Sequence, residues 1–473
     1  MFKIRKFEME HPFLGRVEFD FTKPDGNTFD TIVFAGENGT GKTVILNTLT
    51  SITNIEFWTH TETNYPAKPF KAEIDYDGSI ITLIAERTSV DGQMKVSLIN
   101  KDGIINDNQA NLASKHLQMI LSNVEINFTH TDITVASTED LDSTSSVSQT
   151  IANTADLPSK IAQLFVDINA LDSTDTANYV KSHPNSNVPE DYVDIRMKRF
   201  SRAFAIMFSD YLRFHDIKNI PRDMNSPSKG IFFIKNGKNE VELNSLSSGE
   251  KQVIYRSAFL LRDREPTKGC PVLIDEPEIS MHPKWQEKVY RFFQALFTED
   301  DVQKSQIFMA THSDHVLKSA LEDENALIVK LDTNVGEGTA KAELMHRNSN
   351  GAILPHITLG EVKWRVFDMP TIDFHIDLYS YIQEHLVVDS NGNRIVDAAG
   401  NLTVANVYET DDYLNREGNT SRPSSFTDRS GRIRNYYGLT TYIRNCINHP
   451  DCGTFSEHEL KYSIAFMIGL ATT

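Results

Sequence analysis

The sequence predicts an α/β fold over about the first 345 residues and a mainly helical region after about residue 350. Residues 271–274 and 306–310 are almost entirely apolar, as central strands of a parallel sheet are when helices cover both of their faces. Helical stretches alternate with these strands, which is the order expected of an α/β domain. Beyond residue 350 the apolar spacing becomes helical, over residues 372–386 and 439–447.

The composition limits the class of protein. Of 473 residues, 40% are hydrophobic and 24% are charged, which is ordinary for a globular protein with a buried core. The net charge of −18 argues against a chain whose whole surface coats nucleic acid, because such binding neutralises phosphates with Lys and Arg. No apolar run is long enough for a membrane-spanning helix. The 3 cysteines form neither a disulfide framework nor metal-ligand pairs, so we expect a cytoplasmic location and no membrane partner.

Strand signals open the chain. Residues 17–21 and 72–76 alternate apolar and polar side chains, which predicts strands buried on one face. Residues 31–35 form a short apolar run that ends at a glycine, and we expect a buried strand there.

The middle of the chain combines loop, helix and hairpin signals. Residues 137–160 are rich in Ser, Thr and Asp and predict a loop, whereas residues 190–217 carry an apolar stripe at helical spacing. Apolar runs on either side of Asn236-Gly237 predict a β-hairpin. Four basic residues of the helix indicate one solvated face, or a contact with nucleic acid or an effector: Arg196, Lys198, Arg199 and Arg202.

Turns and a helix cap punctuate the helical region. Residues 388–393 and 397–401 are typical of two tight turns, and a calcium loop is disfavoured because the glycine has the wrong offset. Ser456 and Glu459 form a capping-box pattern, which predicts a final helix running through Phe466.

A glycine-rich segment follows the apolar strand at residues 31–35. Residues 36–43 fit G-x-x-x-x-G-K-[ST] and open a helix, the context in which backbone N–H groups converge on phosphate oxygens at the positive end of the helix dipole. Lys42 would reach the β- and γ-phosphates, and Thr43 would hold Mg²⁺. The segment predicts a site for ATP and Mg²⁺. Its other candidate binding residues are Gly36, Asn38, Gly39 and Gly41.

Two carboxylates end the apolar strand at residues 271–274. Asp275 is expected to support Mg²⁺ through water, and Glu276 to polarise the attacking water as a general base. Two capping carboxylates before Pro277 would explain this pair alone, but not in combination with the phosphate-binding motif.

Two further segments complete a set of four motifs. Residues 246–250 read LSSGE and open a helix, and His312 follows the apolar strand at residues 306–310. With these in place, the chain resembles the ABC-type ATPases, in the soluble AAA-family branch that contains SMC, RecF and OLD-like proteins. LSSGE stands where that family has LSGGQ, and His312 stands where it has the switch histidine. The four motifs occur in family order and span about two-thirds of the chain.

The resemblance implies a head-to-tail dimer of ATPase heads. Each ATP would lie between the phosphate-binding loop of one copy and the LSSGE segment of the other, with Ser247, Ser248 and Gly249 as its contacts. Hydrolysis, with Glu276 and His312 as catalytic residues, would separate the heads, because the nucleotide favours one of two states. The family's Q-loop glutamine stays unassigned between two candidates, Gln109 and Gln118.

We expect an ABC-type ATPase domain over residues 1–348, with a helical lid insertion at about 90–230, and a helical domain over residues 349–473. In the second domain Arg444 and His449 fit R-x4-H, which resembles HEPN domains, many of which are metal-independent RNases. There His449 would act as general acid and base and Arg444 would stabilise phosphate charge. The basic and aromatic surroundings suit RNA. A helical partner-binding or oligomerisation domain is the alternative.

These features narrow the expected function. About 205 residues separate Lys42 from Ser247 without heptads, which disfavours a long-armed chromosome or repair ATPase, and the lack of a D-x-D pair after residue 350 disfavours an OLD-type nuclease. ATPases of this build resemble the ATPase subunits of antiphage systems such as PARIS and Septu. We therefore expect a homodimer or higher oligomer that gates a nuclease, either its own HEPN-like domain or a partner subunit, with RNA such as tRNA as the target. The alternative is a RecF-like DNA repair ATPase with a non-catalytic C-terminal domain.

Overall fold

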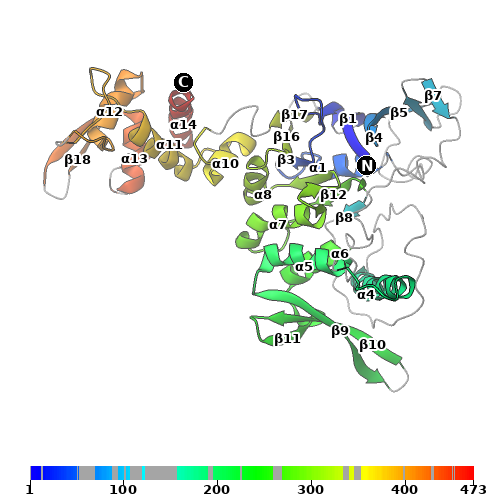
Figure 1. The fold of residues 1–473 in the computed structure, drawn as a ribbon. Coiled ribbons are helices and arrows are strands. Elements are labelled where there is room, and N and C mark those ends of the chain that lie inside the picture. The colour runs from blue at the N-terminus through cyan, green and yellow to red at the C-terminus, as the bar shows by residue number, and fades with distance from the viewer. Residues whose placement is uncertain are drawn as a thin grey trace. The chain divides into compact units, whose positions relative to one another are not determined.

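The chain divides into two compact units, Met1–His346 and Arg347–Thr473, which are described separately. The expected boundary, between residues 348 and 349, lies two residues further along the chain. Figure 1 shows the fold of this computed structural model. The structure describes residues 2–11, 14–50, 52, 70–87, 94–100, 103–106, 120–122, 157–189, 195–223, 226–258, 269–333, 340–345, 353–397, 400–427, 431–449, 451 and 453–472.

A six-stranded, largely parallel sheet forms the centre of the first unit. Its order is β17 (Ala340–Met345), β16 (Ala326–Thr333), β3 (Thr31–Ala35), β15 (Ile307–Thr311), β12 (Val272–Asp275) and β8 (Ile120–Ser122). All neighbours pair in parallel except β16 and β17. Every residue of β3, β15 and β12 is buried, which confirms the prediction that the apolar runs are central strands.

An antiparallel sheet packs beside the parallel one. Its order is β2 (Gly15–Asp20), β1 (Phe2–His11), β4 (Phe70–Tyr76), β5 (Ser79–Arg87), β6 (Met94–Asn100) and β7 (Gly103–Asn106). The alternating burial along β4 confirms the period-two prediction. Aromatic rings join the two sheets: Phe21 of the segment after β2 meets Phe308 of β15 edge to face, with ring centroids 5.4 Å apart.

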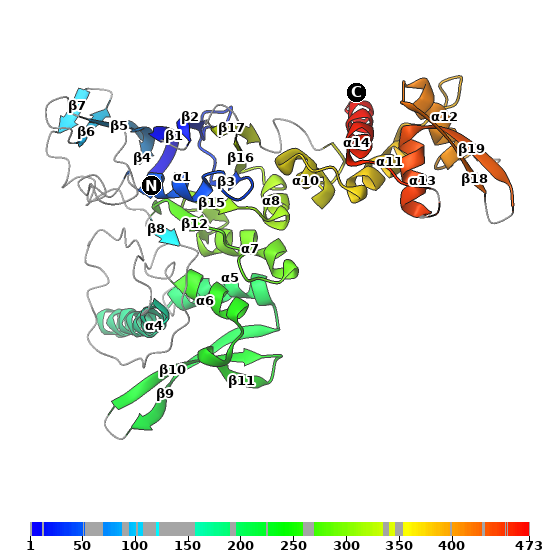
Figure 2. The same cartoon turned by 180° about the vertical axis from the view of Figure 1, so that it is seen from behind.

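Helices follow the strands of the parallel sheet (Figures 1 and 2). These are α1 (Lys42–Thr50) after β3, α7 (Pro283–Leu296) after β12 and α8 (Asp314–Leu321) after β15. A short ribbon of β13 (Thr298–Glu299) and β14 (Val302–Gln303) follows α7. Helix α6 (Ser248–Ala258) precedes β12, after the 3-10 turn η2 (Leu243–Ser245).

The insertion expected at residues 90–230 is not only helical. It contains α4 (Leu157–Ser182) and α5 (Ile195–Phe208), but also β6 and β7, which extend the antiparallel sheet, and β8, which joins the parallel sheet beside β12. The helix expected over residues 190–217 ends at Phe208, because Ser209 takes a φ of +50° and the chain enters β9 (Leu212–Asp223). Residues 137–156 of the expected loop lie outside the described residues.

A three-stranded sheet follows α5. It pairs β9 with β10 (Ser226–Lys235) and β10 with β11 (Asn239–Glu242). Residues 236–238 connect β10 and β11, and Asn236 and Gly237 take φ of +54° and +72°, a region that Asn and Gly enter most easily. The predicted hairpin is confirmed.

The basic stretch of α5 is not one solvated face. Lys198 and Arg202 are exposed, but Arg196 and Arg199 are only 6% and 7% exposed. Arg196 Nη1 donates to Asp172 of α4 at 2.8 Å. The Arg196 side chain therefore stabilises the contact between α4 and α5 through an ion pair. Neither the periodicity nor the composition of the sequence could indicate this pairing.

The second unit is a small helical domain with a hairpin. A common core joins α10 (Leu359–Phe367), α11 (Ile372–His385), α12 (Val407–Arg416), α13 (Leu439–Asn448) and α14 (Glu457–Ala471). The capping box at Ser456 is present, as predicted, and so are the two tight turns, with Gly392 and Gly400 at φ of +81° and +86°. The hairpin of β18 (Ser421–Thr427) and β19 (Ile433–Gly438) is an addition to the expected, mainly helical pattern. Among the described residues no helix has the length and apolarity needed to cross a membrane.

Candidate nucleotide site

The glycine-rich loop joins β3 to α1 in a conformation that only glycine adopts easily. Gly39 and Gly41 have φ of +85° and +93°, a region that L-residues with a side chain rarely enter. A Cβ on Gly36 would lie 2.5 Å from the Leu331 carbonyl oxygen. Asn38 and Gly39 are exposed at the tip of the loop. The loop therefore takes the tight shape that the phosphate-binding motif predicts.

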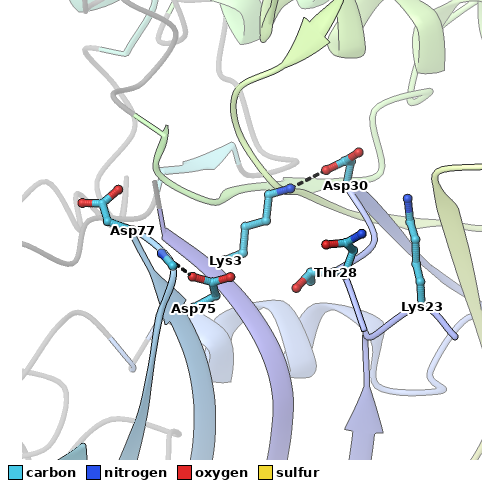
Figure 3. A pocket seen from close by; sticks show the side chains of 8 residues that line it. Lys3, Lys23, Thr28, Asp30, Asp75 and Asp77 are labelled. Carbon is cyan, nitrogen blue, oxygen red and sulfur yellow. Dashed lines mark hydrogen bonds and ion pairs between the residues drawn. The ribbon is translucent and has the colours of Figure 1, made fainter. Parts of the chain in front are cut away.

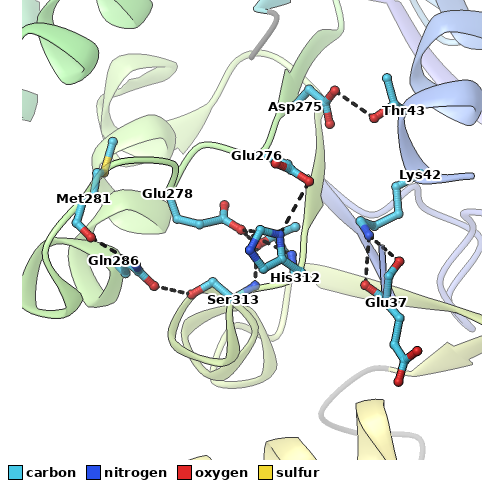
Figure 4. A network of polar contacts seen from close by, with 12 residues as sticks. Glu37, Lys42, Thr43, Asp275, Glu276, Glu278, Met281, Gln286, His312 and Ser313 are labelled. Carbon is cyan, nitrogen blue, oxygen red and sulfur yellow. Dashed lines mark hydrogen bonds and ion pairs between the residues drawn. The ribbon is translucent and has the colours of Figure 1, made fainter. Parts of the chain in front are cut away.

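Lys42 begins α1 and turns back over the loop. Its Nζ donates to the carbonyl oxygens of Gly36 and Glu37, both at 2.8 Å (Figure 4). Burial lowers the pKa of Lys42, and the nearby carboxylates, Glu276 first among them, oppose that change. The ammonium is thus held inside the loop, close to the carboxylates that end β12.

Thr43 and Asp275 connect the loop to the end of β12. The Thr43 hydroxyl donates to Asp275 Oδ2 at 2.9 Å, as Figure 4 shows. Burial raises the pKa of the Asp275 carboxyl to about 6, although the hydrogen bond from Thr43 lowers it. The other carboxylate oxygen, Oδ1, is buried and makes no hydrogen bond.

This pair of oxygens fits Mg²⁺. Magnesium prefers hard oxygen ligands and is usually held by one or two protein groups together with phosphate oxygens and water. A hydroxyl beside a buried carboxylate oxygen that lacks a partner meets that requirement. No cluster of three or more His, Cys, Asp or Glu within the described residues would hold a metal by itself, so phosphate oxygens would have to complete the coordination.

Glu276 and His312 lie side by side at the ends of two neighbouring strands. Because β12 and β15 are parallel, their carboxyl ends meet at one edge of the sheet. His312 Nδ1 lies 3.5 Å from Glu276 Oε1. Glu276 takes a φ of +43°, which costs a residue with a side chain about 1–3 kcal/mol and is tolerated most often at functional sites. Both side chains reach solvent, so a ligand would have access to them.

Glu278 also belongs to this group, and motif reading assigned it no role. It is 3% exposed. Its Oε1 accepts the Thr311 hydroxyl at 2.6 Å and the His312 backbone N–H at 3.2 Å. Burial raises the pKa of this carboxyl, and the hydrogen bond from Thr311 opposes the change. The only sequence signal was its position three residues after Asp275.

A buried arginine lies beneath the carboxylates. Arg256 of α6 is fully buried, and its Nη1 donates to the backbone carbonyl of Asp275 at 2.6 Å. Burial lowers its pKa to about 10, while Glu278, Asp275 and Glu276 raise it. The guanidinium stays charged at neutral pH and offsets the negative charge of the site. Nothing in the local sequence distinguishes this arginine from a surface residue.

The LSSGE segment forms the first turn of α6. Ser247 and Ser248 are exposed. The Ser247 hydroxyl and N–H donate to Glu250 Oε2 at 2.8 and 2.7 Å, and buried Glu250 pairs with Lys235 of β10 at 2.7 Å. A Cβ on Gly249 would lie 2.8 Å from the Ser280 carbonyl oxygen. The segment therefore packs directly against the loop that follows Glu276.

The structure thus brings most of the predicted site residues together in one cluster. Residues 36–43, Asp275, Glu276 and His312 lie at the carboxyl ends of β3, β12 and β15. Ser248 and Gly249 begin α6, and Figures 1 and 2 place α6 below β12 in the view and α1 above it. Gln109 and Gln118, the two Q-loop candidates, lie outside the described residues.

A family of AAA domains matches residues 105–318. Its description reads "AAA domain, putative AbiEii toxin, Type IV TA system", and the matched residues include the LSSGE segment, the β12 carboxylates and His312. The match covers less than half of the chain and does not include the glycine-rich loop. Over these residues the chain resembles an ATPase of this family.

Two curated relatives and a solved structure are similar to parts of the chain. The retron Vc95 probable ATPase of Vibrio cholerae serotype O1 biovar El Tor is 27% identical over 161 residues, which are 32% of this chain and 29% of that protein. The Septu protein PtuA of Bacillus thuringiensis is 27% identical over 154 residues, 29% of this chain and 35% of that protein. The chain thus spans about a third of the length of these relatives. The SMC head domain from Thermotoga maritima has a TM-score of 0.41 at 14% identity, covering 73% of this chain and 99% of that chain.

In the second unit Arg444 and His449 contact different elements. Arg444 Nη1 donates to Asn445 Oδ1 at 3.0 Å, and its guanidinium lies 6.0 Å from the ring centroid of Tyr379 in α11. His449 ends α13, is exposed, and has its ring 4.3 Å from that of Phe426 in β18. The two candidate RNase residues are therefore held by separate contacts on α13.

The basic surroundings of this pair are partly engaged within the unit. Arg422 lies 4.0 Å over the ring of Tyr442 and pairs with Glu459. Tyr436 is buried and Tyr437 is 54% exposed. Arg432 and Arg434 are exposed on β19 or next to it, whereas Arg429 lies outside the described residues.

A pocket of about 360 Å³ opens elsewhere on the first unit (Figure 3). It lies at the start of β3, whereas the glycine-rich loop follows the end of that strand. Lys3 Nζ pairs with Asp30 at 2.5 Å across it. The pocket is separate from the nucleotide site. Its lining residues are Lys3, Lys23, Asn27, Thr28, Asp30, Asp75, Asp77 and Gly78.

Proposed function

We propose that the protein binds and hydrolyses ATP in the presence of Mg²⁺, as an ABC-type ATPase whose heads dimerise around the nucleotide. The observation that carries this proposal is the assembly of Thr43, Asp275, Glu276 and His312 around one edge of the parallel sheet. A glycine-rich loop, an acceptor for the proton of water and a magnesium-type oxygen pair are the parts that phosphoryl transfer needs.

The proposed reaction is hydrolysis of the terminal phosphate. Backbone N–H groups of residues 36–43 and Lys42 hold the phosphates, which lie at the N-terminus of α1. Glu276 accepts a proton from water as the water oxygen bonds to the γ-phosphorus. The bond from that phosphorus to the bridging oxygen then breaks, which releases ADP and phosphate. His312 stabilises the γ-phosphate, and Mg²⁺, held by Thr43 and Asp275, would neutralise charge on the phosphate oxygens.

Three variants test this reaction. Lys42→Ala should abolish ATP binding, and Glu276→Gln should keep binding while lowering turnover by about 100-fold or more, because it keeps the contacts but loses the base. Glu299→Gln, an exposed carboxylate on β13, is the matched control and should hydrolyse ATP at the normal rate. Turnover in Glu276→Gln at half the normal rate or more would remove Glu276 as the base.

Dimerisation supplies a role for the LSSGE segment. Ser247 and Ser248 are exposed at the start of α6, and so are available to a second copy. In the proposed homodimer or higher oligomer each nucleotide contacts Ser247, Ser248 and Gly249 of the opposite copy. Hydrolysis then favours separation, because the nucleotide no longer bridges the two copies.

We further propose that this cycle gates an antiphage-defence effector in the cytoplasm. Support comes from the similarity to a retron ATPase and to Septu PtuA. The effector is either the C-terminal unit or a separate nuclease subunit. The alternative is a RecF-like repair ATPase with a non-catalytic C-terminal unit. Stimulation of ATP hydrolysis by DNA ends or gaps favours repair, whereas a nuclease that copurifies with the ATPase favours defence.

The C-terminal unit would be an RNase only if the exposed His449 takes part in cleavage. In HEPN domains, which this segment resembles, the R-x4-H segments of two copies face each other, so the proposed RNase site would draw on two copies of the chain. Expression of wild type and His449→Ala, with sequencing of cellular RNA ends, tests this point. Cleavage by the wild type alone, with tRNA as the first substrate to inspect, supports a self-contained RNase. Equal cleavage by both removes the pair from catalysis, and no cleavage leaves the unit as a scaffold for a partner.

A further inference from the structure

Glu278 connects the loop after β12 to the loop after β15. Its Oε1 accepts from the Thr311 hydroxyl and the His312 N–H, and it lies 3.6 Å from His312 Nδ1 (Figure 4). The second oxygen, Oε2, is buried without a hydrogen-bond partner. A carboxylate that is 3% exposed is costly to bury unless its charge is used. The Glu278 carboxylate lies against the imidazole of His312, and its charge also acts on the buried guanidinium of Arg256.

The imidazole lies between two carboxylates. Its Nδ1 is 3.5 Å from Glu276 Oε1 and 3.6 Å from Glu278 Oε1. A ring nitrogen that faces two negative oxygens is the one that carries the proton, because the other assignment would place a lone pair against them. Nε2 is then the nitrogen left for a ligand. The tautomer follows from the arrangement of both carboxylates.

We propose that Glu278 is a positioning residue for His312. It fixes the position of the His312 backbone and the tautomer of the His312 ring. The proposal rests on the ATP hydrolysis proposed above. In this proposal Glu278 contacts neither the nucleotide nor the attacking water, and it acts only through His312. A purely structural role, in which Glu278 holds the end of β15 through Thr311, would affect binding and turnover regardless of what stands at position 312.

A double-mutant cycle separates the two roles. Glu278→Gln keeps the shape of the side chain and an oxygen for Thr311, but loses the charge that faces Nδ1. We expect kcat for ATP to fall about tenfold or more with KM changed less than about twofold. In the His312→Ala background the same change should lower kcat by less than about twofold, because the group through which it acts is gone. Equal losses in both backgrounds, or wild-type kcat in Glu278→Gln, would overturn the proposal.

The His312 ring itself provides a readout that does not depend on turnover. In histidine-labelled full-length protein, His312→Ala identifies the His312 ring signals by their disappearance. We expect Glu278→Gln to move the ring nitrogen shifts away from the Nδ1-protonated pattern, and the exposed control Glu299→Gln to leave them unchanged. Unchanged ring signals in Glu278→Gln would contradict the assignment even if hydrolysis fell. If the wild type does not hydrolyse ATP, the proposed function fails, and the ring signals still decide the role of Glu278.

A variant with a shorter carboxylate provides the test if Glu278→Gln does not fold. Glu278→Asp keeps the charge but draws it back by one methylene from Thr311 and from the imidazole. We expect it to fold, to bind ATP with unchanged KM and to lose part of kcat. Wild-type kcat together with unchanged His312 ring signals in this variant would argue against a positioning role.

Discussion

Replacing Arg256 by methionine removes the buried positive charge beneath the candidate nucleotide site and leaves a shorter, unbranched apolar side chain. The guanidinium is fully buried. It donates to the Asp275 carbonyl at 2.6 Å, and its Nε and Nη2 lie 2.9 and 3.2 Å from the Gln252 amide oxygen when that amide faces it. In Arg256→Met these acceptors lose their donors, and the carboxylates above lose a buried counter-charge.

The structure gives the size of the effect. Leaving buried charge uncompensated costs about 3–5 kcal/mol, and an unpaired buried acceptor costs about 1–3 kcal/mol. The two costs overlap in part, so they are not added. We therefore expect Arg256→Met to lower the free energy of opening of the first unit by about 3 kcal/mol or more. Arg291 of α7 has a side chain that is 50% exposed, so Arg291→Met should cost less than about 1 kcal/mol.

Hydrogen–deuterium exchange measures this opening within the full chain. Peptides from α6 and β12 should exchange about 100-fold faster in Arg256→Met than in wild type, and less than about fivefold faster in Arg291→Met. Peptides from the second unit serve as an internal reference in the same sample. If α6 and β12 exchange no faster in Arg256→Met than in Arg291→Met, the buried arginine does not stabilise the carboxylate site.

Three further predictions concern other parts of the fold. Burial lowers the pKa of His375 from 6.5 to about 3. As the pH falls from 6.5 toward 3, the unfolded chain therefore binds a proton that the folded chain does not, and the free energy of unfolding decreases. At pH 5 the decrease is about 2 kcal/mol. Exchange in α11 and α14 should show this loss in wild type but not in His375→Gln. Arg196→Met leaves Asp172 buried without its ion-pair partner and should cost about 3–5 kcal/mol; a cost below 1 kcal/mol in thermal unfolding would rule that out. Gly249→Ala forces a Cβ against the Ser280 carbonyl, so we expect intact binding of a fluorescent ATP analogue but at least about tenfold slower phosphate release, and normal release would show that the loop can yield.

The candidate nucleotide site could largely be identified from the sequence because its motifs are local. Residues 36–43 must form one tight turn in one stretch of sequence, and a strand that ends in Asp275 and Glu276 carries its signal in six consecutive residues. The parallel strands were predictable for a related reason: burial on both faces requires an uninterrupted apolar run.

The residues that motif reading missed depend on contacts between distant segments. Glu278 acquires its place from Thr311 and His312, on a different strand, and Arg256 from a carbonyl 19 residues away along the chain. The sequence indicates a solvated face or a ligand contact for Arg196, because its partner in the structure, Asp172, lies 24 residues earlier.

The hairpin of the second unit was missed for another physical reason. Its strands β18 and β19 are polar and exposed at most positions. Periodicity identifies strands by the apolar face that they bury, and a ribbon that buries little leaves no such pattern. The spacing of Arg444 and His449 likewise fixes their separation along the chain, but not the neighbours that each side chain contacts.

The measurement that tests the account most directly is the oligomeric state of Glu276→Gln with and without Mg-ATP. This variant keeps the proposed contacts to nucleotide and loses the base, so sedimentation velocity should show a shift to a dimer or higher oligomer at saturating Mg-ATP. Lys42→Ala, and a Glu276→Gln protein that also carries Gly249→Ala, should show no shift. A Glu276→Gln protein that binds ATP yet remains monomeric would contradict nucleotide-dependent head dimerisation.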